Sequence, residues 1–292
     1  MSKTIFITGT SSGFGKMMTE TFLKNGHKVI ATMRDMNDRN KDDAEELRGF
    51  DNAEEHLEIL ELDVTSTESV EQVTNHVNEK YSRLDVLINN AGYGTGGITE
   101  GFTEEQIYDL FNVNVFGIHR LTRAFLPMMR RQGNGLIINI SSLMGRVVIP
   151  FSALYTASKY AVEGYSESLR YELKPMGIDV AIIEPGGFGT SFLDNMTAPK
   201  DESRVNEYGD YAKKPEEMWG GVEDNLSGED APDPYEVVEA AVKLVNQPNG
   251  ERDLRIVVDP MMGGGGAPDI NDLTKEKQRE LLTNFGMAQM LN

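Results

Sequence analysis

Short apolar segments alternate with longer amphipathic segments along the chain. Segments rich in Ile, Val and Leu have the length and composition of buried strands, and they occur at Thr4–Thr8, Lys28–Met33, Leu57–Leu62, Leu84–Asn89, Leu136–Ser141, Val180–Glu184 and Leu254–Val258. Helical spacing of apolar residues is found between them, at Phe14–Lys24, Ser66–Lys80, Thr103–Arg131, Ser152–Lys174 and Pro234–Val245. This alternation predicts an α/β fold with a doubly wound, Rossmann-type parallel sheet that has helices on both faces.

Two segments interrupt the alternation. Asp35 to Glu55 is highly charged, which predicts a helix and loop at the surface. Residues 188–234 are rich in Asp, Glu, Gly, Asn and Pro and contain the only tryptophan, Trp219. A long insertion late in an α/β chain is more often a substrate lid than a separate domain, and a decorative surface excursion is the alternative. We expect one catalytic domain over residues 1–260, including this lid, and a C-terminal tail over 261–292 with a helical stretch at Lys275 to Phe285.

A glycine-rich loop joins the first predicted strand to the first predicted helix. Its spacing is Gly-x-x-x-Gly-x-Gly, which differs from the general dinucleotide pattern, so its position carries the prediction. Backbone amides at a helix N-terminus favour a pyrophosphate, and an ordinary glycine-rich turn is the alternative. The residues predicted to bind the cofactor here are Gly9, Ser11, Ser12, Gly13, Phe14 and Gly15.

The end of the second predicted strand bears on the choice of cofactor. An acidic residue here would bind the ribose hydroxyls of NAD(H), but the chain has Met33, Arg34 and Asp35. A guanidinium suits a 2′-phosphate through charge-assisted hydrogen bonds. NADP(H) is therefore favoured over NAD(H), although Asp35 could neutralise Arg34 or bind the ribose itself.

Candidate catalytic residues lie at the end of a strand and the start of a helix. Tyr155 and Lys159 are four residues apart, so they share one face of the predicted helix. An ammonium group near a phenol favours the phenolate, as a reversible proton donor requires. Ser142 follows the strand Leu136–Ser141, at the carboxyl edge where open α/β sheets bind ligands. Its hydroxyl suits a substrate carbonyl oxygen, and the adjacent Ser141 is the alternative.

Four separated motifs resemble those of the short-chain dehydrogenase/reductase family. They are the loop Thr8 to Gly15, the turn Asn89-Asn90-Ala91-Gly92, Ser142 placed 13 positions before Tyr155, and Tyr155-x-x-x-Lys159. The similarity spans about residues 3 to 190 and is weaker near Pro234 to Val258. It implies a sheet of seven strands with the cofactor along its carboxyl edge.

The resemblance also implies roles for individual residues. Tyr155 matches the acid/base, Ser142 the residue that orients the carbonyl, and Lys159 the residue that tunes Tyr155 and binds the nicotinamide ribose. Asn114 matches an asparagine that holds a relay water; an asparagine bonded to backbone is the alternative, and Asn112 nearby makes the register worth checking. The other positions that match cofactor contacts are Asp63, Val64, Asn90, Ala91, Gly92, Pro185, Gly186, Phe188 and Thr190.

These motifs predict an oxidoreductase that interconverts a small-molecule carbonyl and an alcohol by hydride transfer with NADP(H), with Tyr155 as general acid/base. A catalytically silent NAD(P)-binding regulator is one alternative. A dehydratase or epimerase that retains its cofactor is the other.

The amino-acid composition limits the classes of binding partner that we expect for the protein. The chain has 28 basic and 47 acidic residues and a net charge of -19, which disfavours nucleic acid and anionic membranes. It has no cysteine, and its four histidines form no ligand motif, so we expect no metal site and a cytoplasmic protein. The resemblance implies a homodimer or homotetramer formed through the helices around Thr103 to Arg131 and Ser152 to Lys174.

Overall fold

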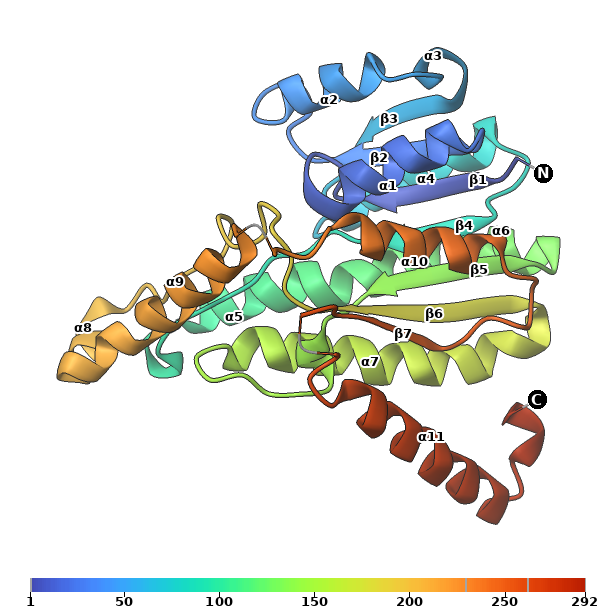
Figure 1. Ribbon diagram of the computed structural model, residues 1–292. Coiled ribbons are helices and arrows are strands. Elements are labelled where there is room, and N and C mark those ends of the chain that lie inside the picture. Colours follow the sequence, from blue (N-terminus) through green and yellow to red (C-terminus); the bar gives the residue numbers. More distant parts are fainter. Residues whose placement is uncertain (1, 229, 262, 292) are drawn as a thin grey trace.

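A single parallel sheet of seven strands forms the centre of the protein, in the order β3-β2-β1-β4-β5-β6-β7 (Figure 1). The computed structural model describes residues 2–228, 230–261 and 263–291. The strands are β1 (Thr4–Thr8), β2 (Lys28–Met33), β3 (Leu57–Glu61), β4 (Val86–Asn89), β5 (Gly135–Ile140), β6 (Ile178–Pro185) and β7 (Arg255–Val258). The strand order reverses direction beside β1, so the predicted doubly wound fold is confirmed.

Helices cover both faces of this sheet. On one face α1 (Gly13–Lys24) and α10 (Tyr235–Asn246) pack together, and on the other lie α4 (Thr67–Lys80), α6 (Ile118–Gln132) and α7 (Ala153–Leu173). Successive side chains of a strand point to opposite faces. Ile5 and Ile7 of β1 therefore enter the first core while Phe6 enters the second. Burial on both faces explains why the strands are apolar at nearly every position.

The prediction of one continuous helix over Thr103–Arg131 is wrong. This segment consists of α5 (Glu104–Phe111), a π-helical segment η2 (Asn112–Gly117) and α6. A capping box between Thr103 and Gln106 starts α5. The π-helical segment contains Asn114, and such segments are frequent at functional sites because they re-aim side chains.

The two segments that interrupt the alternation are more helical than expected. The charged stretch forms α2 (Lys41–Arg48) and α3 (Ala53–His56), and the insertion contains α8 (Glu202–Asn206) and α9 (Lys214–Leu226), which project from the body in Figure 1. In the tail, α11 (Ala267–Asn284) begins well before the predicted Lys275, because Gly266 adopts a φ of 86° and Pro268 occupies the first turn. Short 3-10 turns complete the fold: η1 (Thr99–Gly101), η3 (Leu143–Gly145), η4 (Lys174–Met176), η5 (Gly209–Lys213) and η6 (Ala288–Leu291).

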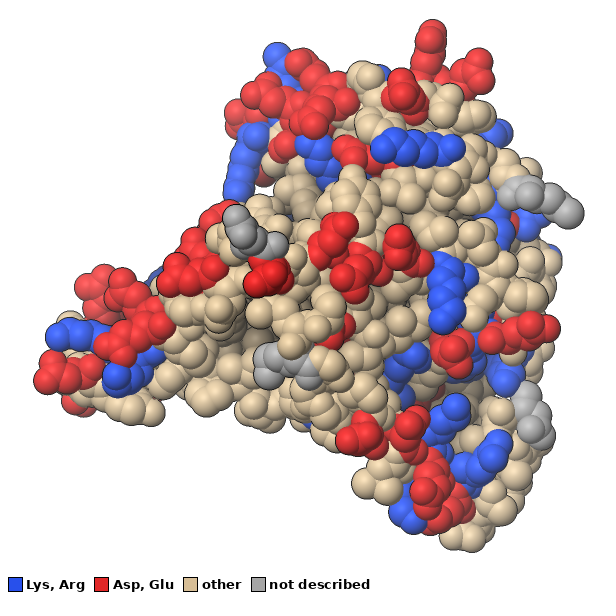
Figure 2. All heavy atoms as spheres, in the orientation of Figure 1, with Lys and Arg blue, Asp and Glu red and all other residues tan. Residues whose placement is uncertain are grey.

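The surface reflects the acidic composition. Figure 2 shows Asp and Glu side chains over the charged stretch, the projecting insertion and α11, with Lys and Arg scattered among them. Within the described part of the chain, each helix is too short or too polar to cross a membrane.

Candidate active site

The phosphate loop is held open at the N-terminus of α1. Gly9 has a φ of 68°, and a Cβ there would lie 2.9 Å from the Cα of Ala91. At Gly15 a Cβ would lie only 2.1 Å from the carbonyl oxygen of Gly9, so the loop closes onto itself only with glycine. Asn90 braces it by donating from Nδ2 to the carbonyl oxygens of Thr8 and Gly9, each at 2.9 Å.

This helix end fits an anionic group. The Ser12 side chain makes no capping hydrogen bond, and the first turn of α1 has no acidic residue. A Cβ at Gly13 would meet only the Thr190 side chain, at 3.8 Å. Free amides and the helix dipole at this end suit a pyrophosphate, and the Ser191 hydroxyl lies beside them, donating to Ser12 Oγ at 3.0 Å.

Arg34 and Asp63 follow the carboxyl ends of the neighbouring strands β2 and β3. Arg34 is exposed, and within the described ranges it has no ion pair, so Asp35 does not neutralise it. Asp35 adopts a left-handed φ of 48°. Burial raises the pKa of the Tyr93 phenol, with a smaller contribution from Asp109, and Arg34 acts in the opposite direction, which places the guanidinium near the loop after β4.

Asp63 is fixed by its own turn, and its neighbour Val64 is buried. Oδ1 of Asp63 accepts hydrogen bonds from the backbone nitrogen of Thr65 at 2.8 Å and from its hydroxyl at 2.7 Å. Val64 packs against Gly117 of the π-helical segment, where a Cβ would lie 2.9 Å from its side chain. Asp63 and Val64 are thus both held in place next to the end of β3.

The segment after β6 lies opposite the phosphate loop. The backbone nitrogen of Gly186 donates to the carbonyl oxygen of Val258 at 2.8 Å, which fixes the exit from Pro185. Phe188 is buried and packs edge-on against Phe14, with ring centroids 5.7 Å apart. Residues predicted from two distant motifs therefore meet where Phe14 and Phe188 pack together.

Asn114 joins three elements at the back of the site. Its Oδ1 accepts from the backbone nitrogen of Tyr93 at 3.1 Å, and its Nδ2 donates to the carbonyl oxygen of Tyr93 at 3.0 Å and to Ser158 Oγ at 3.1 Å. The side chain is 1% exposed. Asn112 instead accepts from Arg120 at 2.7 Å, so it is Asn114 that faces the loop after β4.

Ser142, Tyr155 and Lys159 come together at the carboxyl end of β5. Ser142 caps η3, accepting from the backbone nitrogen of Met144 at 3.1 Å, and its hydroxyl lies close enough to the Tyr155 phenol to lower the phenol's pKa. Lys159 Nζ lies 5.5 Å from the centre of the Tyr155 ring and donates to the carbonyl oxygen of Ile140 at 2.8 Å. Of the two serines it is Ser142 that acts on the phenol, and the buried hydroxyl of Ser141 has no hydrogen-bond partner among the described residues.

Burial controls the charge states in this group. It raises the pKa of the Tyr155 phenol well above its usual range, and the hydrogen bond from Ser142 opposes the rise. Burial lowers the pKa of Lys159 to about 8, and the charge of Glu163 opposes that fall. The phenol therefore holds its proton at neutral pH and is ready to donate it.

An apolar residue of the insertion covers this group, and in the sequence such residues suggest either a moderately hydrophobic substrate or ordinary loop packing. Phe192, from the insertion, packs against Tyr155 with ring centroids 5.4 Å apart. It fits closely beside Gly94, where a Cβ would lie 2.7 Å from its ring. The insertion thus contacts Tyr155 directly, and the sequence does not indicate which of its apolar residues makes that contact.

Comparison with known proteins places this site in a family. The short chain dehydrogenase profile matches residues 3–201. A 3-ketodihydrosphingosine reductase from Bacteroides thetaiotaomicron is 40% identical over 206 residues, which cover 70% of this chain and 71% of the relative. The fold and the residues described above thus belong to an oxidoreductase class that acts on CH-OH groups. The chain is a member of the short-chain dehydrogenase/reductase family.

Solved structures agree with that membership. A short-chain dehydrogenase from Streptomyces avermitilis has a TM-score of 0.76 and 30% identity, covering 99% of this chain and 98% of the other. An actinorhodin polyketide ketoreductase with NADPH has a TM-score of 0.72 and 28% identity, covering 90% of this chain and 97% of the other. Solved neighbours of this fold contain NADP in some cases and NAD in others. The chain is therefore an NAD(P)-dependent oxidoreductase.

Proposed function

We propose that the protein reduces a carbonyl compound to an alcohol, reversibly and with NADP(H), and that Tyr155 is its general acid/base. The observation that carries this proposal is the buried group of Ser142, Tyr155 and Lys159 beside an uncapped helix N-terminus. The nucleotide supplies the hydride when it is bound. Proton transfer and orientation fall to the residues of the chain.

Each catalytic side chain then has one task. Ser142 donates a hydrogen bond to the carbonyl oxygen as negative charge grows there, and Tyr155 gives its phenolic proton to the same oxygen. Lys159 stabilises the phenolate left behind through its positive charge. In the opposite direction the phenolate accepts the proton of the alcohol. Asn114 keeps the loop after β4 and Ser158 in place behind this group, and we assign it the relay water.

We assign a separate set of residues to each part of the cofactor. Backbone amides of Gly13, Phe14 and Gly15 face the pyrophosphate, with the Ser11 and Ser12 side chains at the rim. Arg34 binds the 2′-phosphate, and Asp63 with Val64 contacts adenine. We assign the nicotinamide end to Asn90, Ala91, Gly92, Tyr155, Lys159, Pro185, Gly186, Phe188 and Thr190, which border the same edge of the sheet.

Replacing Arg34 tests the preference for NADP(H). In Arg34→Ala we expect affinity for NADPH to fall about tenfold to a hundredfold, because charge-assisted hydrogen bonds are lost. Affinity for NADH should stay within about twofold, since NADH has no 2′-phosphate. Titration of both nucleotides by calorimetry, with Arg39→Ala as a matched exposed control, measures the effect. Equal losses for the two nucleotides would rule out Arg34 as the phosphate ligand.

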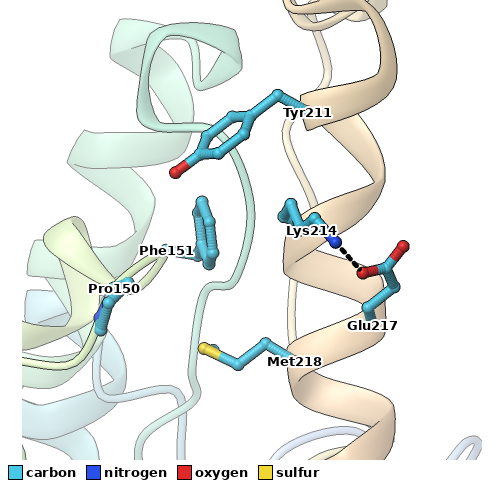
Figure 3. Close-up of a pocket in the computed structure, with 6 residues that line it drawn as sticks. All are labelled: Pro150, Phe151, Tyr211, Lys214, Glu217 and Met218. Carbon is cyan, nitrogen blue, oxygen red and sulfur yellow. Dashed lines mark hydrogen bonds and ion pairs between the residues drawn. The ribbon is translucent and has the colours of Figure 1, made fainter.

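The insertion forms an apolar wall that favours a lipophilic substrate. Beside it lies a cavity of about 430 Å³ lined by Pro150, Phe151, Tyr211, Lys214, Glu217 and Met218 (Figure 3). The rings of Phe151 and Tyr211 approach to 5.9 Å, and Lys214 is paired with Glu217 at 2.5 Å, so little charge is left for a polar ligand. The Bacteroides relative is named as a 3-ketodihydrosphingosine reductase, which agrees with the reduction of a keto group.

We expect Phe192 to form the inner part of the lid that residues 188–234 provide. In Phe192→Ala we expect KM for small, polar ketones to change little and KM for bulky apolar ketones to rise several-fold, because the apolar contact next to Tyr155 is lost. A panel of ketones and aldehydes assayed with NADPH and NADH, for the wild-type protein and this variant, checks both the substrate class and the lid. A uniform change in KM across the panel would remove Phe192 from the substrate site.

The proposal also covers the oligomeric state of the protein and its location in the cell. Between α6 and α7 the outer surface has a groove of about 720 Å³ whose lining includes Leu126, Pro127 and Leu173. We propose that a second copy packs there, as a homodimer or homotetramer, and that the protein works in the cytoplasm. Light scattering of the purified protein measures the assembly.

A further inference from the structure

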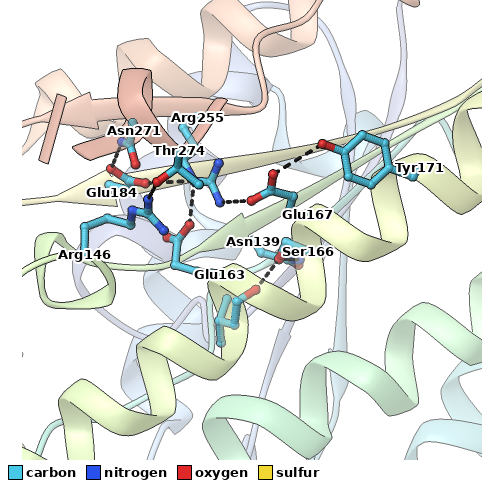
Figure 4. Close-up of polar contacts among 11 residues, drawn as sticks. Asn139, Arg146, Glu163, Ser166, Glu167, Tyr171, Glu184, Arg255, Asn271 and Thr274 are labelled. Carbon is cyan, nitrogen blue, oxygen red and sulfur yellow. Dashed lines mark hydrogen bonds and ion pairs between the residues drawn. The ribbon is translucent and has the colours of Figure 1, made fainter. Parts of the chain in front are cut away.

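A buried ionic cluster lies beside the catalytic helix (Figure 4). Arg255 of β7 donates from Nε to Glu163 Oε2 at 2.8 Å and from Nη2 to Glu167 Oε2 at 2.7 Å. Glu184 of β6 adds a third carboxylate, with Oε1 at 3.3 Å from the same Nε. The four side chains, Glu163, Glu167, Glu184 and Arg255, are called the carboxylate cluster below, and all are between 0% and 15% exposed.

The C-terminal helix α11 closes the carboxylate cluster. Asn271 donates from Nδ2 to Glu184 Oε2 at 2.8 Å, and the hydroxyl of Thr274 accepts from Arg146 at 2.8 Å. Buried ion pairs often stabilise a fold no better than apolar residues of the same volume, because each charge loses its hydration. Three buried carboxylates around one guanidinium therefore call for an explanation other than stability.

Glu163 connects the carboxylate cluster to the catalytic lysine. It follows Lys159 by four residues in α7, so the two lie on one face, about 6 Å apart along the helix axis. The loop that carries Ser142 crosses directly over Glu163, where a Cβ at Gly145 would lie 2.9 Å from Glu163 Cγ. Glu163 Oε1 has no hydrogen-bond partner in the described part of the chain.

We propose that Glu163 is a positioning residue: its carboxylate, fixed by Arg255, keeps the ammonium group of Lys159 charged beside Tyr155. This inference rests on the function proposed above for Tyr155 and Lys159. Lys159 donates one hydrogen bond, to a neutral carbonyl. Without a nearby anion, burial would favour its neutral form. The phenolate of Tyr155 would then lose the charge that stabilises it.

The charged groups around Lys159 and Glu163 support the role proposed for Glu163. Burial lowers the pKa of Lys159 to about 8, and the charge of Glu163 raises it. Burial, followed by the charge of Glu163, raises the pKa of Glu184 to about 7. The charged groups around Glu163 are therefore Lys159 and Glu167 on its own helix, Glu184 on β6 and Arg255 on β7, and the charge of Arg146, after η3, acts on Glu184.

The test measures the titration of Lys159 without cofactor or substrate. Lysines labelled with carbon-13 at the ε-carbon are followed by NMR against pH, and Lys159→Arg identifies the signal. We expect the midpoint to fall by about one pH unit in Glu163→Gln, about tenfold in the protonation equilibrium. It should not move in Glu167→Gln, which also loses a bond to Arg255 but lies about 12 Å from Lys159 along the helix. Glu163→Asp keeps the charge and should keep the midpoint, which allows the test even if the glutamine variant does not fold.

Each outcome decides the proposal. A midpoint that falls only in Glu163→Gln supports it, and in the active enzyme the alkaline limb of kcat/KM for reduction should move to lower pH by the same amount. An unchanged midpoint, equal falls in both glutamine variants, or a fall in Glu163→Asp overturns it. Because the NMR titration needs no turnover, these results are separate from a failure of the proposed function, which would appear as activity surviving in Tyr155→Phe.

Discussion

Tyr155→Phe should lower kcat for carbonyl reduction by about a hundredfold to ten-thousandfold. Only the hydroxyl is removed, so the ring still packs against Phe192, and Ser142 keeps its bond to the backbone of Met144. The substrate oxygen loses its proton donor, while the other residues assigned to the cofactor stay in place. NADPH affinity should therefore stay within about twofold, measured by nucleotide titration beside steady-state rates.

The matched control for this variant is Tyr160→Phe. Tyr160 lies on the same helix and also donates a hydrogen bond, to the carbonyl oxygen of Arg146 at 2.7 Å, but it is 43% exposed. Its loss should leave kcat within about twofold, as is usual for an exposed group away from the chemistry. If Tyr155→Phe behaved like this control, with full turnover, Tyr155 would not be the proton donor.

Gly15→Ala should abolish high-affinity nucleotide binding. The added methyl would lie 2.1 Å from the carbonyl oxygen of Gly9 and 2.6 Å from Asn90 Nδ2. The first contact is with backbone, so the loop itself must shift, and overpacking of this kind costs about 1 to 3 kcal/mol. We expect NADPH affinity to fall at least about a hundredfold and the thermal midpoint to fall by several degrees, about what such a loss does to a domain of this size.

A second glycine separates this clash from the general effect of the substitution. Gly164 also lies in a helix, is exposed, and a Cβ there would meet nothing within 4 Å. Gly164→Ala should leave nucleotide binding unchanged and add up to about 1 kcal/mol of stability through helix propensity. Calorimetric titration and thermal unfolding of both variants check the comparison. Nucleotide affinity preserved in Gly15→Ala would contradict the assignment of this loop.

The parts of the fold that follow from local patterns could be predicted from the sequence. Strands buried on both faces are apolar along their whole length, and β1 and β2 begin and end where the pattern places them. The group of Ser142, Tyr155 and Lys159 was predictable too, because a strand end and four-residue spacing on a helix fix its geometry. Ser142 rather than Ser141 borders Tyr155, which needed the structure to decide.

The remainder depends on contacts between distant residues, which no local pattern records. The π-helical segment at Asn114 has the same apolar spacing as a continuous α-helix. Its wider turn therefore cannot be recognised from the sequence. The start of α11 is set by consecutive glycines with positive φ. Phe192 against Tyr155, and Arg255 of β7 with Glu163 of α7, join segments that are far apart in the chain.

The proposed function requires net hydride transfer between the nucleotide and a carbonyl carbon, with Tyr155 moving the proton. The most direct measurement supplies NADPH deuterated at the hydride-donating position, with a ketone turned over by the wild-type protein, and locates the label in the product. The account predicts one deuterium at the carbinol carbon for each NADPH consumed. A product formed without label and without loss of NADPH absorbance, as in a dehydration or epimerisation, would contradict it.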